Sequence, residues 1–373
     1  MAMLRRSGLV AALVILSAGA AAAASLAEPM REVERLRGLT FLHDVTQRTI
    51  EREDLRAMLR KQLASSVPYS LQEYADVLEA LQLIDSSKGA IDQMLALYDS
   101  QVLAFYDPLT HTYFAIKELP SSIAGMSGAG AITDSVVIHE LIHALQDQRF
   151  GAAERDRALL HDTDGELAYH ALLEGEASLV MLESLIEKSG QSFDEAVRSG
   201  LLLGAMNAGA ATDMMIGKDV PRYFVESLKF PYLDGLKLVI EGYKRGGWKE
   251  IDRMDGNPPR TTREVLHPDE YFARLDRGEA GAPPFDPPAT PGVMTTERLG
   301  EFHWRFLVGE AARGWVDDRV TIGCDGIVTV DARWENSDRA AAFRDAYVSF
   351  LRRRGIEPRV SVDGDAVKVV YAP

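Results

Sequence analysis

The chain contains 373 residues, 46% of them hydrophobic, and has a formal net charge of −15. This length and composition can support one large domain or two modest domains. The negative charge argues against nucleic acid or an anionic membrane surface as the main partner. Cys324 is the only cysteine, so no intramolecular disulfide can form and the core must stabilise the fold.

The first 24 residues have the pattern of a secretory signal peptide. Arg5 and Arg6 form a charged start, an apolar run covers residues 9–20, and an alanine-rich stretch completes residues 1–24. The pattern predicts a secreted or periplasmic protein whose mature chain begins near Ser25 and has no stable membrane insertion. An uncleaved anchor is the alternative. No other run reaches the roughly 18 apolar residues that a membrane span needs.

The next part of the chain predicts helices and one β-hairpin. Alternation over residues 45–50 predicts a strand. Asp107-Pro108 lies between apolar runs at 102–106 and 113–116, which is typical of a hairpin with a proline turn. Helical patterns cover residues 31–37, 52–63, 71–84 and 91–98.

An H-E-x-x-H pattern at residues 139–143 lies inside an apolar, helix-patterned run. On a helix, His139 and His143 lie one turn apart on one face, and two neutral imidazoles at that spacing can share a tetrahedral zinc ion. Glu140 is rotated by about 100° from His139, so it can act as a general base on water at the metal. The segment Ile132-Thr133-Asp134-Ser135 contains N-cap residues and predicts that the helix begins just before the apolar run that carries the motif. Two unrelated surface histidines are the alternative.

A third zinc ligand is expected from a second helix, predicted at residues 164–189. Glu174 and Glu176 lie about 200° apart on such a helix, so only one of them can face the metal. Small residues flank Glu174 on its own face and would let two helices approach closely, so we expect Glu174 to be the ligand. Glu176 and Asp164 are alternatives. His170, one turn before Glu174, is a candidate for an additional ligand or a supporting group.

The H-E-x-x-H pattern followed by Glu174-Gly-x-Ala resembles the gluzincin metallopeptidases, the thermolysin-like clan, and the second motif is similar to that of zinc aminopeptidases. F-P-Y-x-x-G at 230–235 and P-P-x-T-T-x-x-x-L-H-P-x-x-Y at 258–271 resemble a family of secreted, largely uncharacterised bacterial metallopeptidases. The resemblance covers about residues 37–353. It implies a zinc cofactor, a zincin-like fold, and a peptide or protein substrate that pairs with an edge strand before the motif helix. Ser178 stands where the thermolysin-like pattern has Asp, which leaves the supporting partner of the histidines open.

Two downstream residues, His267 and Tyr271, are candidate catalytic donors. The gluzincin resemblance implies a His or Tyr that stabilises the oxyanion on the scissile carbonyl. His267 precedes Pro268, and a rigid loop could place both side chains over the cleft. The alternative is a structural turn in which His267 only satisfies a backbone carbonyl.

The end of the chain predicts a linker and a second region. Residues 277–295 are rich in proline and glycine and indicate a linker or a long surface loop. Residues 296–373 predict an α+β region. Its expected helices cover 297–312 and 339–353, and its expected strands cover 320–322, 327–330, 359–362 and 367–371.

These patterns together predict an α+β, mainly helical zincin-like metallopeptidase domain over residues 25–276, with a small sheet above the H-E-x-x-H helix. The expected function is a secreted zinc-dependent peptide hydrolase. His139, His143 and Glu174 would bind zinc, and Glu140 would be the general base. A non-catalytic, zinc-containing binding protein is the alternative from another class, and a closed site with four protein ligands would favour it.

Overall fold

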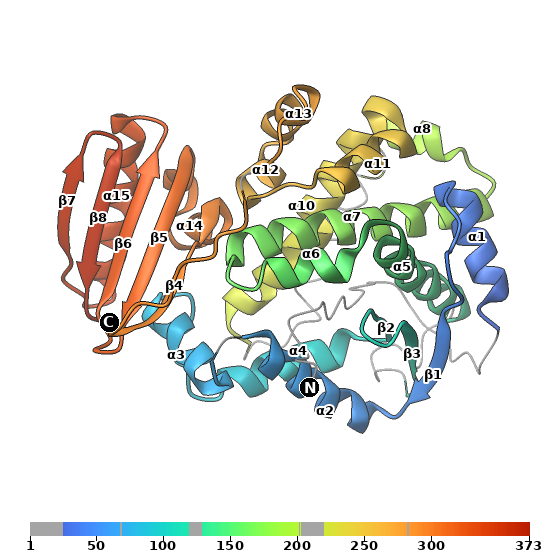
Figure 1. The fold of residues 1–373 in the computed structure, drawn as a ribbon, viewed down its shortest axis with the longest axis horizontal. Coiled ribbons are helices and arrows are strands. Elements are labelled where there is room, and N and C mark those ends of the chain that lie inside the picture. Colours follow the sequence, from blue (N-terminus) through green and yellow to red (C-terminus); the bar gives the residue numbers. More distant parts are fainter. Residues whose placement is uncertain (1–24, 68, 119–128, 201, 203–219, 282) are drawn as a thin grey trace.

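The chain folds as an α+β protein with two separate sheets, and the central helices lie between them (Figure 1). Among the described residues, no helix is both long enough and apolar enough to cross a membrane. The expected secretory signal at residues 1–24 lies outside the described part of the chain. A computed structural model describes residues 25–67, 69–118, 129–200, 202, 220–281 and 283–373.

Four helices in the first part of the chain confirm the helical patterns of the sequence. Ser70 caps the third of them, because its hydroxyl accepts from the Glu73 amide at 3.2 Å while the Glu73 carboxylate accepts from the Ser70 amide at 2.8 Å. This helix ends earlier than expected, and Gln82 just beyond it has φ 61°, a left-handed conformation that cannot continue a helix. The helices are α1 (Ala27–Arg37), α2 (Arg52–Ser66), α3 (Leu71–Ala80) and α4 (Ala90–Gln101).

The predicted hairpin and the predicted strand at 45–50 form one three-stranded sheet. Strands β2 (Ala104–Asp107) and β3 (Thr112–Ile116) pair antiparallel, which confirms the hairpin. Strand β1 (Thr46–Ile50) pairs in parallel with β3, so the strand order is β1-β3-β2 and β2 lies at an edge. Strand β2 packs beside the H-E-x-x-H helix, as expected of a small sheet next to that helix.

The motif helix begins earlier than the sequence indicated. Helix α5 starts at Ala129, so residues 132–135 lie inside it and the prediction that they cap it is wrong. Alanine is the strongest helix former, and the alanines at 129 and 131 extend the helix toward its start. The neighbouring helices are α5 (Ala129–Phe150), α6 (Ala152–Ala158), α7 (Thr163–Lys188), α8 (Phe193–Arg198) and α10 (Arg222–Gly246).

Helices α7 and α10 lie side by side at the centre of the molecule (Figure 1). Two glycines make this close packing possible. A Cβ atom on Gly235 would lie 2.0 Å from the carbonyl oxygen of Ala171, and one on Gly175 would lie 2.4 Å from the carbonyl oxygen of Gly235. Any side chain at either position would therefore push the helices apart. Gly175 directly follows Glu174, and this crossing fixes the position of that carboxylate.

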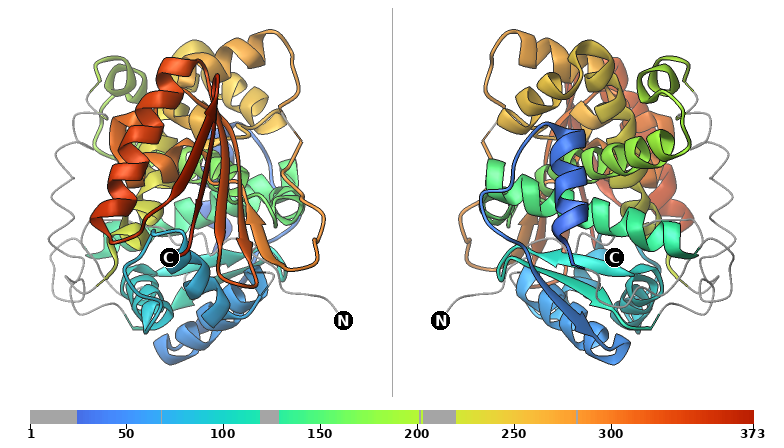
Figure 2. Two further views of the ribbon diagram at one scale, coloured as in Figure 1. Left: turned by 90° about the vertical axis from the view of Figure 1, so that its left-hand side faces the viewer. Right: turned by 90° about the vertical axis from the view of Figure 1, so that its right-hand side faces the viewer.

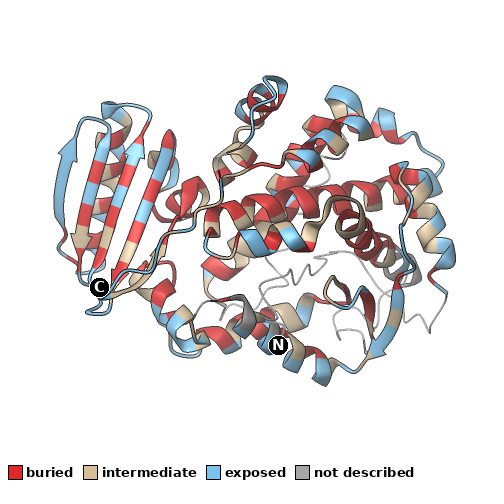
Figure 3. Ribbon diagram, viewed as in Figure 1, coloured by how far each residue is buried: buried red, intermediate tan, exposed pale blue. Residues whose placement is uncertain are grey.

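The C-terminal region is a five-stranded antiparallel sheet with helix α15 along one face (Figure 2, left). Buried and exposed residues alternate along β5 and β6, as Figure 3 shows, because one side of each strand faces α14 and α15. The strand order is β4-β5-β6-β8-β7. The elements are β4 (Val293–Glu297), α14 (Gly300–Val308), η2 (Gly309–Ala312), β5 (Trp315–Gly323), β6 (Val328–Trp334), α15 (Ser337–Arg353), β7 (Arg359–Asp363) and β8 (Ala366–Tyr371).

The two expected helices and four expected strands of this region are confirmed, but β4 was not predicted. Strand β4 pairs with β5, and its first residues belong to the segment that the sequence assigned to a linker. One hydrophobic cluster joins residues of α2–α4, such as Leu59 and Leu78, to Trp304, Trp334 and Phe343. The C-terminal sheet therefore packs against α2–α4. That residues 296–373 form a region distinct from the metallopeptidase-like part stays a prediction. Three short helices precede the linker, α11 (Trp248–Gly256), α12 (Thr262–Leu266) and α13 (Pro268–Asp276).

Candidate metal centre

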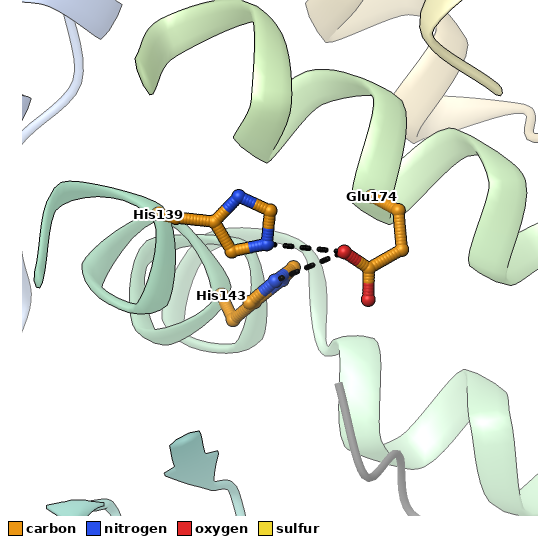
Figure 4. A group of neighbouring side chains, drawn as sticks. All are labelled: His139, His143 and Glu174. Carbon is orange, nitrogen blue, oxygen red and sulfur yellow. Dashed lines mark hydrogen bonds and ion pairs between the residues drawn. The ribbon is translucent and has the colours of Figure 1, made fainter. Parts of the chain in front are cut away.

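His139 and His143 of α5 point toward Glu174 of α7 (Figure 4). The Nε2 atoms of His139 and His143 lie 3.0 Å and 3.8 Å from Oε2 of Glu174. One ligand atom from each of the three residues lies within 4.8 Å of the others. A tetrahedral zinc ion with bonds of about 2.0–2.1 Å separates its ligand atoms by about 3.3 Å. The three side chains therefore fit one metal ion, and this buried group can hold it.

Burial shifts the pKa values of all three side chains and so determines their protonation states. Burial lowers the pKa of His139 to about 3 and the pKa of His143 to about 4, so both imidazoles are neutral near pH 7. Burial also raises the pKa of Glu174 to about 7, against the opposing charges of His143 and His170 and a hydrogen bond from Tyr232. Neutral imidazole is the form that binds metals, and a cation would favour the ionised carboxylate.

Glu140, the expected general base, is fully buried and is held by the small sheet. Its Oε2 atom accepts a hydrogen bond from the backbone amide of Tyr106 on β2, at 2.9 Å. Its charge also contributes, after burial, to raising the pKa of Tyr113 on β3. The motif helix therefore points its carboxylate toward the edge strand of the sheet, while the two histidines face α7.

Gln146, three residues after His143, holds the second histidine in a defined state. Its Nε2 donates to the carbonyl oxygen of Leu173 at 3.0 Å and to Oε2 of Glu176 at 2.6 Å. Both partners are oxygens that only accept hydrogen bonds, so the nitrogen and oxygen of the Gln146 amide cannot exchange places. Its Oε1 atom, 2.8 Å from Nδ1 of His143, must then accept a hydrogen bond from that nitrogen, which therefore carries the proton. The lone pair of His143 is consequently on Nε2, the atom that faces Glu174.

The same network continues to the N-terminal helix. Glu176 accepts a short hydrogen bond from Nε of Arg37 on α1, and Arg37 also contacts Asp255 at 3.1 Å and Asp252 at 2.7 Å. Arg37 is 1% exposed, and although burial opposes its charge, Glu176 and Asp255 raise its pKa above the ordinary value. Of the two candidate carboxylates, Glu174 thus meets the histidines and Glu176 neutralises a buried arginine.

Tyr232 also borders the centre, and sequence reasoning did not select it. Its ring lies 6.2 Å from the ring of His139 at an interplanar angle of 23°, and its side chain hydrogen-bonds to Glu174. It follows Pro231 inside α10 and lies three residues before Gly235, where α10 meets α7. The signal was present in the F-P-Y-x-x-G motif, which had no assigned role.

His170 and Asp164 have partners outside the centre. Nε2 of His170 lies 2.8 Å from Oδ1 of Asp156. Burial opposes the charged form, but that hydrogen bond and the charge of Asp156 raise the pKa of His170 to about 9. Asp156, Glu166 and His170 form a second group with ligand atoms within 4.8 Å of one another. Asp164, the other rival ligand, accepts from the amide of Thr262 at 3.0 Å.

The structure does not bring His267 and Tyr271 to the centre. Nε2 of His267 lies 2.9 Å from Oε1 of the buried Glu301, and the Tyr271 hydroxyl donates to the carbonyl oxygen of Asn257 at 3.0 Å. Neither residue lines the cavities that border His143 and Glu174. In Figure 1, α12 and α13 lie above α7, whereas α5 lies below it. These contacts suit a structural role, and catalytic roles for the two residues stay predictions.

Comparisons with known proteins add no assignment to this geometry. No family model matches the chain, and no curated protein or solved structure matches it significantly. The interpretation of the centre therefore depends on its own residues, distances and burial.

Proposed function

We propose that this chain is a secreted, zinc-dependent peptide hydrolase of the gluzincin type with a zincin-like fold. The observation that carries the proposal is the buried group of His139, His143 and Glu174, with Glu140 held on the same helix. A structural metal site has no use for a carboxylate placed next to its ligands. A hydrolase needs one to handle the proton of water.

The donor set favours zinc. Two imidazole nitrogens and one carboxylate oxygen are the ligands of a catalytic zinc site that keeps a fourth position for water or substrate. Bound zinc acidifies its water and polarises the scissile carbonyl. The alternative, a closed site in a non-catalytic binding protein, would need a fourth protein ligand. The two candidates for it are engaged elsewhere, Glu176 by Arg37 and Gln146, and His170 by Asp156.

Glu140 is proposed as the general base. Its carboxylate would accept the proton of the attacking water and then deliver it to the amine that leaves when the peptide bond breaks. The Tyr106 amide holds this carboxylate through its Oε2 atom. Strand β2 carries that amide on the side that does not pair with β3, so the strand and the motif helix hold Glu140 between them.

A peptide library tests the proposal when it is incubated with zinc-loaded wild type and with Glu140→Gln. We expect cleavage by the wild type and a loss of at least about 10²-fold in the variant, with zinc content unchanged. Glu154→Gln, an exposed change nearby, is the matched control and should keep full activity. Equal cleavage by wild type and Glu140→Gln, or no cleavage by either, would overturn the proposal.

Export is the part of the proposal that rests on the sequence of residues 1–24 alone. Mass spectrometry of the protein recovered from an exporting bacterial host should find an N-terminus near Ser25. A protein that keeps Met1 and sediments with membranes would instead support the uncleaved anchor.

A further inference from the structure

Two cavities extend from the candidate metal centre along α7. The first, of about 200 Å³, has Glu174 and Tyr232 in its wall, and the second encloses about 230 Å³. Seven residues line both cavities, among them His170, Glu166 and Thr163, so the two spaces are continuous. Each of these three α7 residues lies about one turn further from Glu174 than the one before it. We name the second space the distal cavity.

The distal cavity is walled by aliphatic side chains of three helices. Leu59 and Leu63 of α2, Leu78 of α3 and Met94 of α4 are among its lining residues. No lysine or arginine lies among the described residues of its wall. The ionisable side chains Glu166 and His170 lie in the part of the wall that the two cavities share, and an apolar group would gain from burial against the aliphatic part.

Two polar residues in the wall of the distal cavity, Glu297 and His303, have partners within the protein. The Glu297 carboxylate accepts from the hydroxyls of Thr163 at 2.8 Å, Thr295 at 2.7 Å and Tyr69 at 3.3 Å. His303 contacts the Tyr223 hydroxyl at 3.1 Å through Nε2 and the Leu299 carbonyl oxygen through Nδ1. Neither Glu297 nor His303 therefore needs a charged ligand as a partner.

The helical rise gives the distance between the cavity and the metal centre. Eight residues separate Glu174 from Glu166, and eleven separate it from Thr163, which corresponds to about 12 Å and 16 Å along α7. An extended peptide advances about 3.3–3.6 Å per residue. A side chain in the distal cavity would thus belong to a residue about four positions from a peptide bond at the metal centre.

We propose that the distal cavity is a specificity pocket for one bulky apolar side chain, about four residues from the scissile bond of the peptide substrate. The inference rests on the proposed function and narrows its substrate class. The continuous wall along α7 joins the pocket to the metal centre, and the aliphatic lining selects leucine-like or aromatic groups. Short peptides would be cleaved slowly because they cannot reach the pocket.

The test uses zinc-loaded enzyme and peptides in which one leucine is moved through positions three to five on each side of the bond, in an alanine background. Leucine at one of these positions should raise kcat/KM by about 10- to 100-fold over the all-alanine peptide, mainly by lowering KM. Leu63→Trp, which narrows the pocket, should abolish that preference and lower kcat/KM of the leucine peptide to that of the all-alanine peptide. Leu63→Ala, which widens it, should shift the preference from leucine toward tryptophan. Leu42→Trp, at a leucine that is 52% exposed, is the control and should behave as wild type.

A binding measurement separates failure of the pocket from failure of the proposed function. The same peptides, labelled with a fluorophore, are titrated with zinc-loaded Glu140→Gln, and the preference for leucine should persist without turnover. Cleavage by the wild type with no leucine preference in either assay would overturn the pocket and leave the proposed function standing. Tight, leucine-dependent binding without any cleavage would overturn the hydrolase and leave the pocket standing. If Leu63→Trp lowered kcat/KM equally for short and long peptides, Leu63 would have a structural role and the pocket would be overturned.

Discussion

Replacing Gln146 with alanine tests whether the network behind His143 sets the metal affinity. The change removes the acceptor of the His143 Nδ1 proton and the donor to Leu173 and Glu176, three contacts of 2.6–3.0 Å. Partners of this kind typically change metal affinity by about 10- to 100-fold. That range corresponds to about 1.4–2.8 kcal/mol. We expect the zinc affinity of Gln146→Ala to fall within it.

The affinity is measured by titrating the purified protein with zinc in competition with a chromogenic chelator. Gln148→Ala is the matched control, since Gln148 lies two positions further along α5 and bonds to Leu42 and His43 rather than to a histidine of the centre. Its zinc affinity should equal that of the wild type. Equal affinities in Gln146→Ala and Gln148→Ala would refute the reasoning.

Denaturant unfolding of the metal-free protein separates the positioning role from a structural one. Gln146→Ala leaves two buried acceptors without their donor, which typically costs about 1–3 kcal/mol for each. We expect the variant to lose both stability and zinc affinity. A loss of stability alone, with unchanged affinity in the folded fraction, would show that Gln146 supports the fold and not the metal.

Three further predictions follow from buried groups. Glu174→Ala should weaken zinc binding far more than Glu176→Ala in chelator competition, and the reverse order would mean that the wrong carboxylate was chosen. Burial lowers the pKa of His303 to about 4, so the unfolded state gains its proton first as pH falls. Stability should therefore drop between about pH 6.5 and pH 4 by on the order of 3 kcal/mol, and less steeply in His303→Gln, as denaturant unfolding would measure. His267→Ala should lower the melting temperature, because the buried Glu301 loses a partner. It should leave kcat of the folded fraction unchanged. A fall in kcat at normal stability would instead support a catalytic role for His267.

The local patterns of the sequence anticipated that His139, His143 and Glu174 come together, because helical geometry links near neighbours. The spacing of His139 and His143 determined their common face, and small flanking residues identified Glu174 as the carboxylate between two close helices. The hairpin and most helices followed from periodicity and turn residues. Strand β4 was missed because its pairing with β5, and not its own five residues, makes it a strand.

The contacts around the centre could not be predicted, because they join residues far apart in the chain. Arg37 and Glu176 are 139 positions apart, and nothing in either local pattern indicates a pair. Tyr232 reaches Glu174 only because Gly235 lets α10 lie against α7. His267 and Tyr271 were chosen for residue type and a rigid local chain, and tertiary packing gave both of them other partners.

X-ray absorption at the zinc edge, on protein purified without added chelator, tests the central claim most directly. We predict about one zinc per chain with nitrogen and oxygen ligands at about 2.0–2.1 Å, two of them imidazoles. This signal should vanish in the His139→Ala/His143→Ala double variant. A sulfur ligand, which only Cys324 or a methionine could supply, or full zinc occupancy in the double variant, would contradict the account.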